Sequence, residues 1–302
     1  MDERRPLCAE ASRESAEPLA ATASRIENWI LLEYRGLWSR DILAGSGLSD
    51  QVKAYLREQL AALPRSRLLF VRRPERRQHP EHALYVARTA ERGSIMLGTE
   101  LGDYAELRGL DLVGALETGA ADWASPVEGP LLVVCTHGKR DRCCAKFGRP
   151  LYDAVREQAE EGTVWQASHV GGDRFAGNLV SLPAGLYFGR VERAGVWALL
   201  DEVLAGRVPL ERYRGRSCYS FAEQAAERAV RETAGVTGPD DLALLSSEPE
   251  ADGWIVRFEV SGSVHEVTVA AELGEPTYLT CEAASLSRPR RFVPRTHRVV
   301  SS

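Results

Sequence analysis

The sequence predicts a protein of the α/β class, α+β overall, built from several units along one chain. Three observations predict this class. Short apolar runs alternate with stretches whose apolar residues recur at helical spacing. The same order of strands and helices is found twice along the chain. The C-terminal part then changes to alternating apolar and polar residues, as in a hairpin with one exposed face.

The composition agrees with a folded chain. Of the 302 residues, 44% are hydrophobic and 27% charged, which is close to globular averages and unlike disordered or coiled-coil proteins. This length fits one large domain or two to three ordinary ones.

The N-terminal residues 1–24 are polar, rich in Ala, Ser and Glu and without a period, so we expect a flexible tail. The first folded unit is expected over residues 25–125. Residues 49–63 predict a helix in this unit, because Ser49 or Asp50 can cap it and its apolar residues recur at helical spacing. The predicted strands of the unit are 28–34, 68–71, 83–87 and 94–97.

A second unit is expected over residues 126–212. Its predicted strands are 131–135, 164–168, 179–182 and 186–191. One helix is expected with Pro150 near its first turn, and another at 194–205. The resulting order, β-α-β-β-β-α, is the minimal pattern of a thioredoxin-like domain. Residues 28–112 show roughly the same order without any cysteine, which predicts a degenerate copy of that fold over 25–125.

The remaining residues, 213–302, are expected to form a small α+β domain. An Ala-rich stretch at 220–234 predicts a helix. Alternating residues at 254–260 and 264–269 predict a hairpin. From Ser287 onward the chain is rich in Arg and Pro and is interpreted as a tail.

Charge and hydropathy argue against two classes of partner. The 38 basic and 43 acidic residues give a net charge of −5, which disfavours a dedicated nucleic-acid binder. No apolar run approaches the roughly 20 residues of a membrane-spanning helix. The chain opens with charged residues and lacks the apolar core of a secretion signal, so we expect a cytoplasmic protein in a reducing compartment. The oligomeric state is left open.

Cysteine is sparse overall but locally concentrated. The chain has six cysteines, too few for a disulfide scaffold. Three of them, Cys135, Cys143 and Cys144, fall within ten residues, which indicates a metal or redox site. Cys8 and Cys218 stand apart from this group and are interpreted as incidental.

The main candidate site lies at the ends of two predicted strands. Cys135 ends one strand, His169 follows the next, and Cys144 lies close to the helix between them. Because a βαβ unit brings its strand ends together at the ligand-binding edge of a sheet, Cys135, Cys144 and His169 are predicted to converge. Thiolates and imidazole are ligands of Zn²⁺ and of iron–sulfur clusters.

The neighbouring residues are expected to support a negatively charged site. Arg140 and Arg174 would offset the charge, and Gly171 and Gly172 would let the backbone donate N–H groups to sulfur. His137 is expected to donate a structural hydrogen bond. The full set of supporting residues is His137, Arg140, Asp141, Gly171, Gly172 and Arg174.

Two motifs and a hairpin carry a resemblance to a known family. CTHGKRDRCCAKFGRPL and SHVGGDRFAGN, followed by a hairpin ending in LYFGRV, resemble the sucrase/ferredoxin-like family, also described as thioredoxin-like [2Fe-2S] ferredoxin-related proteins. The resemblance covers most of residues 28–205 and is most specific over 131–191. It implies a thioredoxin-like fold holding a [2Fe-2S] cluster, which eukaryotic members bind through two Cys and two His.

This sequence departs from the family pattern at one ligand position. The two cysteines fall on Cys135 and Cys144 and the first histidine on His169, but the second histidine position holds Asp173. Asp173 as cofactor ligand would be a hard oxygen donor, unusual on iron–sulfur clusters. The alternatives for the fourth position are Cys281, Cys143 or no cluster at all.

The function implied by the resemblance is electron transfer rather than catalysis, so no catalytic residue is assigned. The chain would carry one electron between a reductase and an acceptor such as an oxygenase. A sucrase activity is not supported, because no pair of carboxylates stands out as a glycosidase site. Two alternatives stay open: a thiol-dependent redox enzyme that uses Cys135 or Cys144 beside Arg140 and His137, and a Zn-stabilised interaction module.

Overall fold

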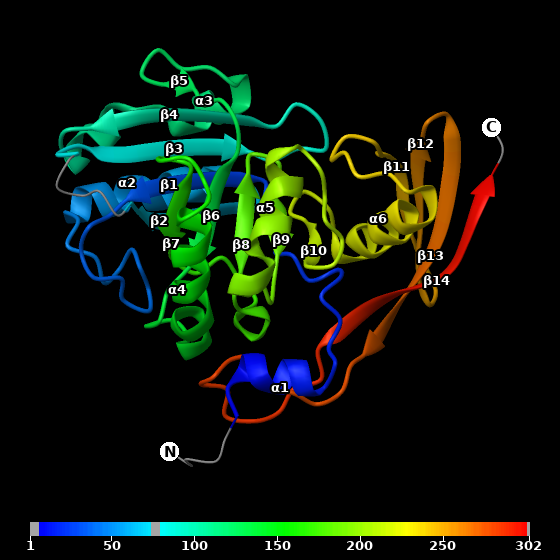
Figure 1. The fold of residues 1–302 in the computed structure, drawn as a ribbon. Coiled ribbons are helices and arrows are strands. Elements are labelled where there is room, and N and C mark those ends of the chain that lie inside the picture. The colour runs from blue at the N-terminus through cyan, green and yellow to red at the C-terminus, as the bar shows by residue number, and fades with distance from the viewer. Residues whose placement is uncertain (1–5, 74–78, 301–302) are drawn as a thin grey trace.

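The computed structural model describes residues 6–73 and 79–300, which form two β-sheets (Figure 1). The larger sheet has ten strands in the order β10-β9-β8-β6-β7-β2-β1-β3-β4-β5. The smaller has four strands in the order β11-β12-β13-β14. The chain is therefore a mixed α/β protein with a separate small antiparallel sheet near its C-terminus.

The first half of the large sheet has thioredoxin-like pairing. β1 pairs parallel with β2 and antiparallel with β3, and β3 pairs antiparallel with β4. This gives the strand order β2-β1-β3-β4. The elements are β1 (Asn28–Glu33), α2 (Asp50–Ala62), β2 (Ser66–Arg72), β3 (His82–Arg88), β4 (Ile95–Leu101) and α3 (Leu112–Thr118).

The second half repeats this arrangement. β6 pairs parallel with β7 and antiparallel with β8, and β8 pairs antiparallel with β9, so the order is β7-β6-β8-β9. The elements are β6 (Leu131–Cys135), α4 (Arg142–Arg156), β7 (Val164–Ala167), β8 (Leu179–Leu182), β9 (Leu186–Phe188) and α5 (Val196–Leu204). The predicted degenerate copy is confirmed by this identical pairing.

The two halves share one sheet rather than standing apart. β2 pairs antiparallel with β7, with Val71 opposite Ala167. Two short strands complete the edges: β5 (Ser125–Pro126) beside β4, and β10 (Tyr213–Arg216) beside β9. The two halves are therefore parts of one continuous hydrogen-bonded sheet.

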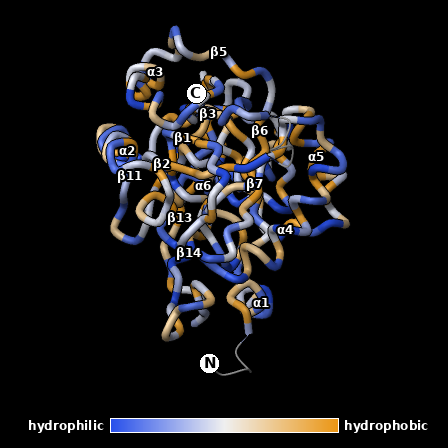
Figure 2. Tube along the Cα trace, turned by 90° about the vertical axis from the view of Figure 1, so that its left-hand side faces the viewer, coloured by the Kyte–Doolittle hydropathy of each residue, from blue (hydrophilic) through white to orange (hydrophobic). Residues whose placement is uncertain are grey.

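Alternate residues of the large sheet face two different cores. Trp29 and Leu31 belong to one buried cluster together with Val133 and Cys135, so the two halves share this core. Ile30 packs instead on the face covered by α2 and α3. Successive residues of a strand point to opposite faces of the sheet. Because the central strands are apolar at every position, both faces of the sheet are buried. Hydrophobic residues concentrate along the central strands (Figure 2).

The C-terminal part confirms the predicted helix and hairpin and adds strands. Ser220 caps α6 (Phe221–Ala234), which packs on the small sheet. The strands are β11 (Ala243–Glu250), β12 (Gly253–Val260), β13 (Ser263–Leu273) and β14 (Arg290–Val300). The prediction of a tail after Ser287 is wrong. β14 is an edge strand, where Pro294 is tolerated because its missing N–H costs no ladder bond on the open side.

The flexible tail expected over residues 1–24 is also wrong for its described part. Residues Cys8–Glu14 form helix α1, and Cys8 and Ala9 are fully buried. Glu17 accepts a hydrogen bond from Ser12 at 2.7 Å and pairs with Arg174 at 2.9 Å. A seven-residue helix is not stable alone, so tertiary contacts hold this segment.

Helix α4 begins earlier than the sequence indicated. Asp141 caps it by accepting from the backbone N–H of Cys143 at 2.8 Å, so the helix starts at Arg142. Pro150, expected near the first turn, lies in the helix interior. As a result Cys143 and Cys144 are both in the first helical turn.

Candidate metal centre

Three side chains from separate elements meet at the end of β6. The sulfurs of Cys135 and Cys144 and a ring nitrogen of His169 all lie within 4.8 Å of one another. Cys135 is the last residue of β6, Cys144 is in the first turn of α4, and His169 follows β7. We call these residues, together with Asp173, the first cluster.

Asp173 joins the other three through direct contacts. Its Oδ1 lies 3.0 Å from Nδ1 of His169 and accepts from the Cys144 sulfur at 3.1 Å. Gly171 and Gly172 precede it with φ of 103° and 81°, left-handed values that glycine adopts without strain. The loop thereby turns back and brings Asp173 into contact with His169.

Burial and hydrogen bonding shift the pKa values within the first cluster. The hydrogen bond with Cys144 lowers the pKa of Cys135, which is 1% exposed, and raises that of Cys144. Burial disfavours the charged form of His169, but its contacts with Asp173 and Cys135 raise its pKa to about 9. These shifts favour the charged forms of Cys135, His169 and Asp173, because the protonated imidazole is paired with two acidic groups in a buried site.

The residues predicted to support this site have different roles. His137 is buried with Nε2 2.9 Å from the carbonyl oxygen of Ser39, and its backbone N–H donates to the Cys135 sulfur. Burial opposes ionisation of Asp173, but its hydrogen bond with His169 lowers the pKa of the carboxyl, and the charge of Arg140 adds to this lowering. Arg174 pairs with Glu17 of the N-terminal segment instead.

The glycines and Asp141 serve the backbone around the cluster. The carbonyl of Gly171 accepts from Arg214 at 3.0 Å, and that of Gly172 from Asn178 at 2.9 Å. These bonds fix the loop that presents Asp173. Asp141 caps α4 and faces another group of cysteines.

An open hollow reaches the first cluster at His169, whose side chain is 23% exposed. Its volume is about 500 Å³. The charged lining consists of Arg40, Arg67 and Arg140 with one carboxylate, Asp41, beside His137 and His169. Arg40 also pairs with Glu282. Cationic side chains thus outnumber the carboxylate at the exposed edge of the first cluster.

A second group of potential ligands also includes a residue from the first turn of α4. It comprises Cys8, Asp141, Cys143 and Cys281, all buried, with ligand atoms within 4.8 Å of one another. Cys143 and Cys281, considered as fourth ligands of the first cluster, lie here instead. The interpretation of Cys8 as incidental is wrong, because α1 buries it in this group. Nothing in the sequence near Cys8 or Cys281 signals this meeting. We call these four residues the second cluster.

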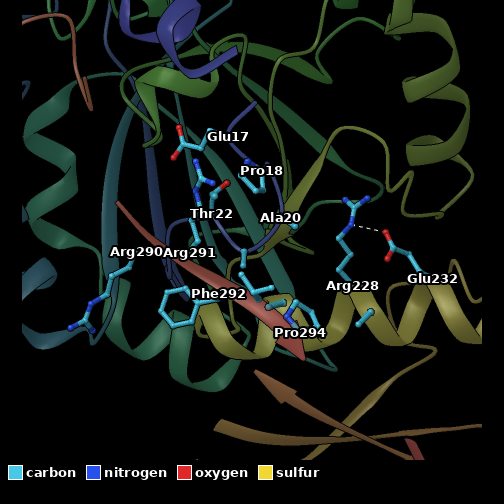
Figure 3. A pocket seen from close by; sticks show the side chains of 14 residues that line it. Glu17, Pro18, Ala20, Thr22, Arg228, Glu232, Arg290, Arg291, Phe292 and Pro294 are labelled. Atoms are coloured by element: carbon cyan, nitrogen blue, oxygen red, sulfur yellow. Dashed lines mark hydrogen bonds and ion pairs between the residues drawn. The ribbon is translucent and has the colours of Figure 1, made fainter. Parts of the chain in front are cut away.

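A separate pocket lies between the N-terminal segment, α6 and β14 (Figure 3). Its volume is about 230 Å³, and Glu17, Thr22 and Phe292 are among its lining residues. Arg228 and Glu232 pair with each other across 2.7 Å at its wall. Because its lining holds no cysteine or histidine, this pocket is not a candidate metal centre.

A model of the sucrase/ferredoxin-like family matches residues 19–215, about two thirds of the chain. The chain belongs to the sucrase/ferredoxin-like family. The resemblance seen in the sequence is thereby confirmed, and the matched range contains all residues of the first cluster.

Curated relatives of this sucrase/ferredoxin-like protein come from yeasts. It is similar to "Altered inheritance of mitochondria protein 32" of Debaryomyces hansenii, with 33% identity over 28% of this chain and 35% of the relative. The protein of the same name from Eremothecium gossypii is 29% identical over 37% of this chain and 42% of the relative. The matches thus span less than half the length of these relatives.

Among solved structures, a thioredoxin-like [2Fe-2S] ferredoxin from Aquifex aeolicus matches 29% of this chain and 90% of its own. The identity is 20% and the TM-score 0.25, too low for its geometry to be transferred. Within residues 6–73 and 79–300, no helix has the length and apolarity required to cross a bilayer.

Proposed function

We propose that this protein transfers electrons by means of a [2Fe-2S] centre, and that the four residues of the first cluster bind this centre. The observation that carries the proposal is the meeting of two cysteine sulfurs and a histidine nitrogen within 4.8 Å at the end of β6. These are the positions at which the family motifs place its ligands. When bound, the iron–sulfur group would supply a one-electron oxidation and reduction.

The donor set fits such a group. Cys135 and Cys144 supply soft sulfur, and His169 supplies imidazole nitrogen. Asp173 is in contact with both Cys144 and His169, so its carboxylate is the fourth donor available in this cluster. Replacement of thiolate by imidazole raises the potential of an iron–sulfur centre relative to an all-thiolate one.

The protein would bury the sulfur ligands of the centre and leave its histidine edge exposed. Cys135 and Cys144 are each 1% exposed, so water is kept from the sulfur side. His169 reaches the hollow lined by Arg40, Arg67 and Arg140. This positive surface would steer an acidic redox partner, a reductase or an acceptor, toward the histidine edge. A reducing, cytoplasmic compartment suits six free cysteines.

A thiol enzyme is the second candidate, because the pKa of Cys135 is lowered by its bonds with Cys144 and His169. Reactive cysteines need some exposure to meet a substrate. Cys135 is 1% exposed at the end of a core strand, so the geometry favours the metal-binding reading.

The test is anaerobic reconstitution of the full chain with ferrous iron and sulfide. We expect about two iron and two sulfide per chain, visible absorption, and an EPR signal on reduction. The double variant Cys135→Ser/Cys144→Ser should lose the bound iron and sulfide, the absorption and the EPR signal. The control Cys218→Ser, which changes a cysteine outside both clusters, should keep them. A wild-type chain that takes up no iron and sulfide and stays colourless under these conditions would overturn the proposal.

A further inference from the structure

The second cluster brings together three cysteines that are far apart in the sequence. Cys8 opens α1, Cys143 lies in the first turn of α4, and Cys281 is in the segment between β13 and β14. Figure 1 shows that segment passing beside α1. The three segments meet only through the tertiary fold, so neighbouring sequence does not account for the contact.

The three sulfurs form a compact triangle. Cys143 Sγ lies 3.3 Å from Cys281 Sγ and 3.5 Å from Cys8 Sγ, and the third side, Cys281 to Cys8, is 3.7 Å. Zn–S bonds of about 2.3 Å in a tetrahedron place two sulfurs about 3.8 Å apart. The triangle is therefore slightly smaller than one tetrahedral ion requires. Three cysteines on an iron–sulfur cluster would have to spread over more than one iron atom, which this triangle does not provide.

The carboxylate of Asp141 lies close enough to the sulfurs to be the fourth donor. Both oxygens of Asp141 lie 3.7 Å from Cys8 Sγ. The backbone N–H groups of Cys143 and Cys281 donate to these oxygens at 2.8 and 2.6 Å, which fixes the carboxylate beside the sulfurs. Such orientation by neighbouring N–H groups is typical of metal ligands.

We propose that Cys8, Cys143 and Cys281, with Asp141, bind one Zn²⁺ ion in a structural site separate from the first cluster. Sulfur donors with one carboxylate in a closed tetrahedral set suit zinc, which has no redox chemistry of its own. All four side chains are buried, so no position is open to a substrate. On binding, the three thiols release their protons to solvent, and each sulfur forms a bond to zinc.

The ion would tie two weakly structured segments to the large sheet. Helix α1 has seven residues, too few to be stable on its own. The segment after β13 contains one isolated bridge, between Thr277 and Ser287. With zinc in place, both would be fastened to the start of α4, immediately beside the first cluster. The two sites share no residue, so either proposal can fail without the other.

The test uses Co²⁺ as a spectroscopic substitute for zinc in the full chain. Because the first cluster also offers sulfur and imidazole, the background is the double variant Cys135→Ser/Cys144→Ser. We expect this background to bind about one Co²⁺ per chain with sulfur-to-metal absorption. Adding Cys8→Ser and Cys281→Ser should abolish this binding, and adding Cys218→Ser should leave it unchanged.

A second measurement covers the case in which these variants fold poorly. Zinc and iron are both measured in Cys281→Ser, with wild type as reference and circular dichroism as the check of folding. We expect loss of zinc and retention of iron and sulfide. The proposal is overturned if the background variant binds no Co²⁺, or if Cys281→Ser loses iron in place of zinc. Two further measurements could also overturn it. One is a thiol reagent that reacts equally fast with the three cysteines in the presence and absence of zinc; the other is a Cys143–Cys281 disulfide found by mass spectrometry in freshly reduced protein.

Discussion

The adjacent residues Cys143 and Cys144 belong to different clusters. Cys144 Sγ is 3.1 Å from Asp173 Oδ1, whereas Cys143 Sγ is 3.3 Å from Cys281 Sγ. Consecutive residues of an α-helix point about 100° apart, as 3.6 residues per turn requires, so one turn of α4 can serve two sites. The cap at Asp141 sets where that turn begins and therefore which way each sulfur points.

Asp173→His introduces the histidine that the family resemblance implies at this position. If Asp173 is the fourth ligand, the variant should keep about two iron per chain, because imidazole is a competent ligand, while its absorption and EPR spectra shift. Asp173→Ala should lower iron retention. Spectra of Asp173→His identical to those of wild type would show that the carboxylate does not bind the cluster.

Gly148→Ala tests whether the spacing of α4 from β6 sets the geometry of the first cluster. A Cβ at Gly148 would collide with the carbonyl oxygen of Cys135, a backbone atom that cannot move aside cheaply. We expect a loss of about 1–3 kcal/mol in unfolding free energy and reduced iron uptake. The matched control is Gly195→Ala, where a Cβ would meet open space. Equal iron uptake by both variants would contradict this account.

The buried pair Arg231–Glu227 should be important for docking α6 onto β10. The Nε of Arg231 is 3.0 Å from Glu227, which also accepts from the Tyr213 hydroxyl at 3.1 Å, and both charged residues are at most 1% exposed. Arg231→Met leaves a buried carboxylate unpaired and should cost about 3–5 kcal/mol in urea unfolding. The exposed pair of Arg149 offers the control: Arg149→Met should cost less than about 1 kcal/mol.

Removal of the proposed zinc should loosen the N-terminal segment without affecting the first cluster. A strong zinc chelator is predicted to lower the unfolding free energy by about 2 kcal/mol and the melting temperature by about 3 °C. Limited proteolysis should then cut within residues 6–24, which contain α1. Iron content, measured in the same samples, should stay constant. Unchanged melting and unchanged cleavage after zinc has left would argue against a structural role.

The sequence predicted the first cluster better than the second. Cys135 and His169 end strands of one βαβ unit, and that topology alone brings them together, with Cys144 close by. No such local rule applies to Cys8 or Cys281, because their meeting depends on how α1 and the β13–β14 segment pack on the large sheet. Pairing between β2 and β7 is likewise a contact between the two copies that periodicity does not specify.

The two segments predicted as tails, at the N-terminus and after Ser287, were misassigned for the same reason. The polar sequence around α1 and the Arg- and Pro-rich sequence of β14 both lack the apolar period by which elements are recognised. Cys8 and Ala9 are nevertheless buried by the packing of other segments. β14 is ordered by pairing with β13 at the edge of the small sheet. In both cases long-range contacts outweigh weak local preference.

The central claim, a redox centre with mixed cysteine and histidine ligation, is tested most directly by pulsed EPR on reduced, reconstituted protein carrying ¹⁵N-labelled histidine. The account predicts a cluster signal with hyperfine coupling to one imidazole nitrogen, and loss of that coupling with retention of the signal in His169→Cys. A signal without any histidine coupling in the wild-type chain, or no cluster signal at all, would contradict it.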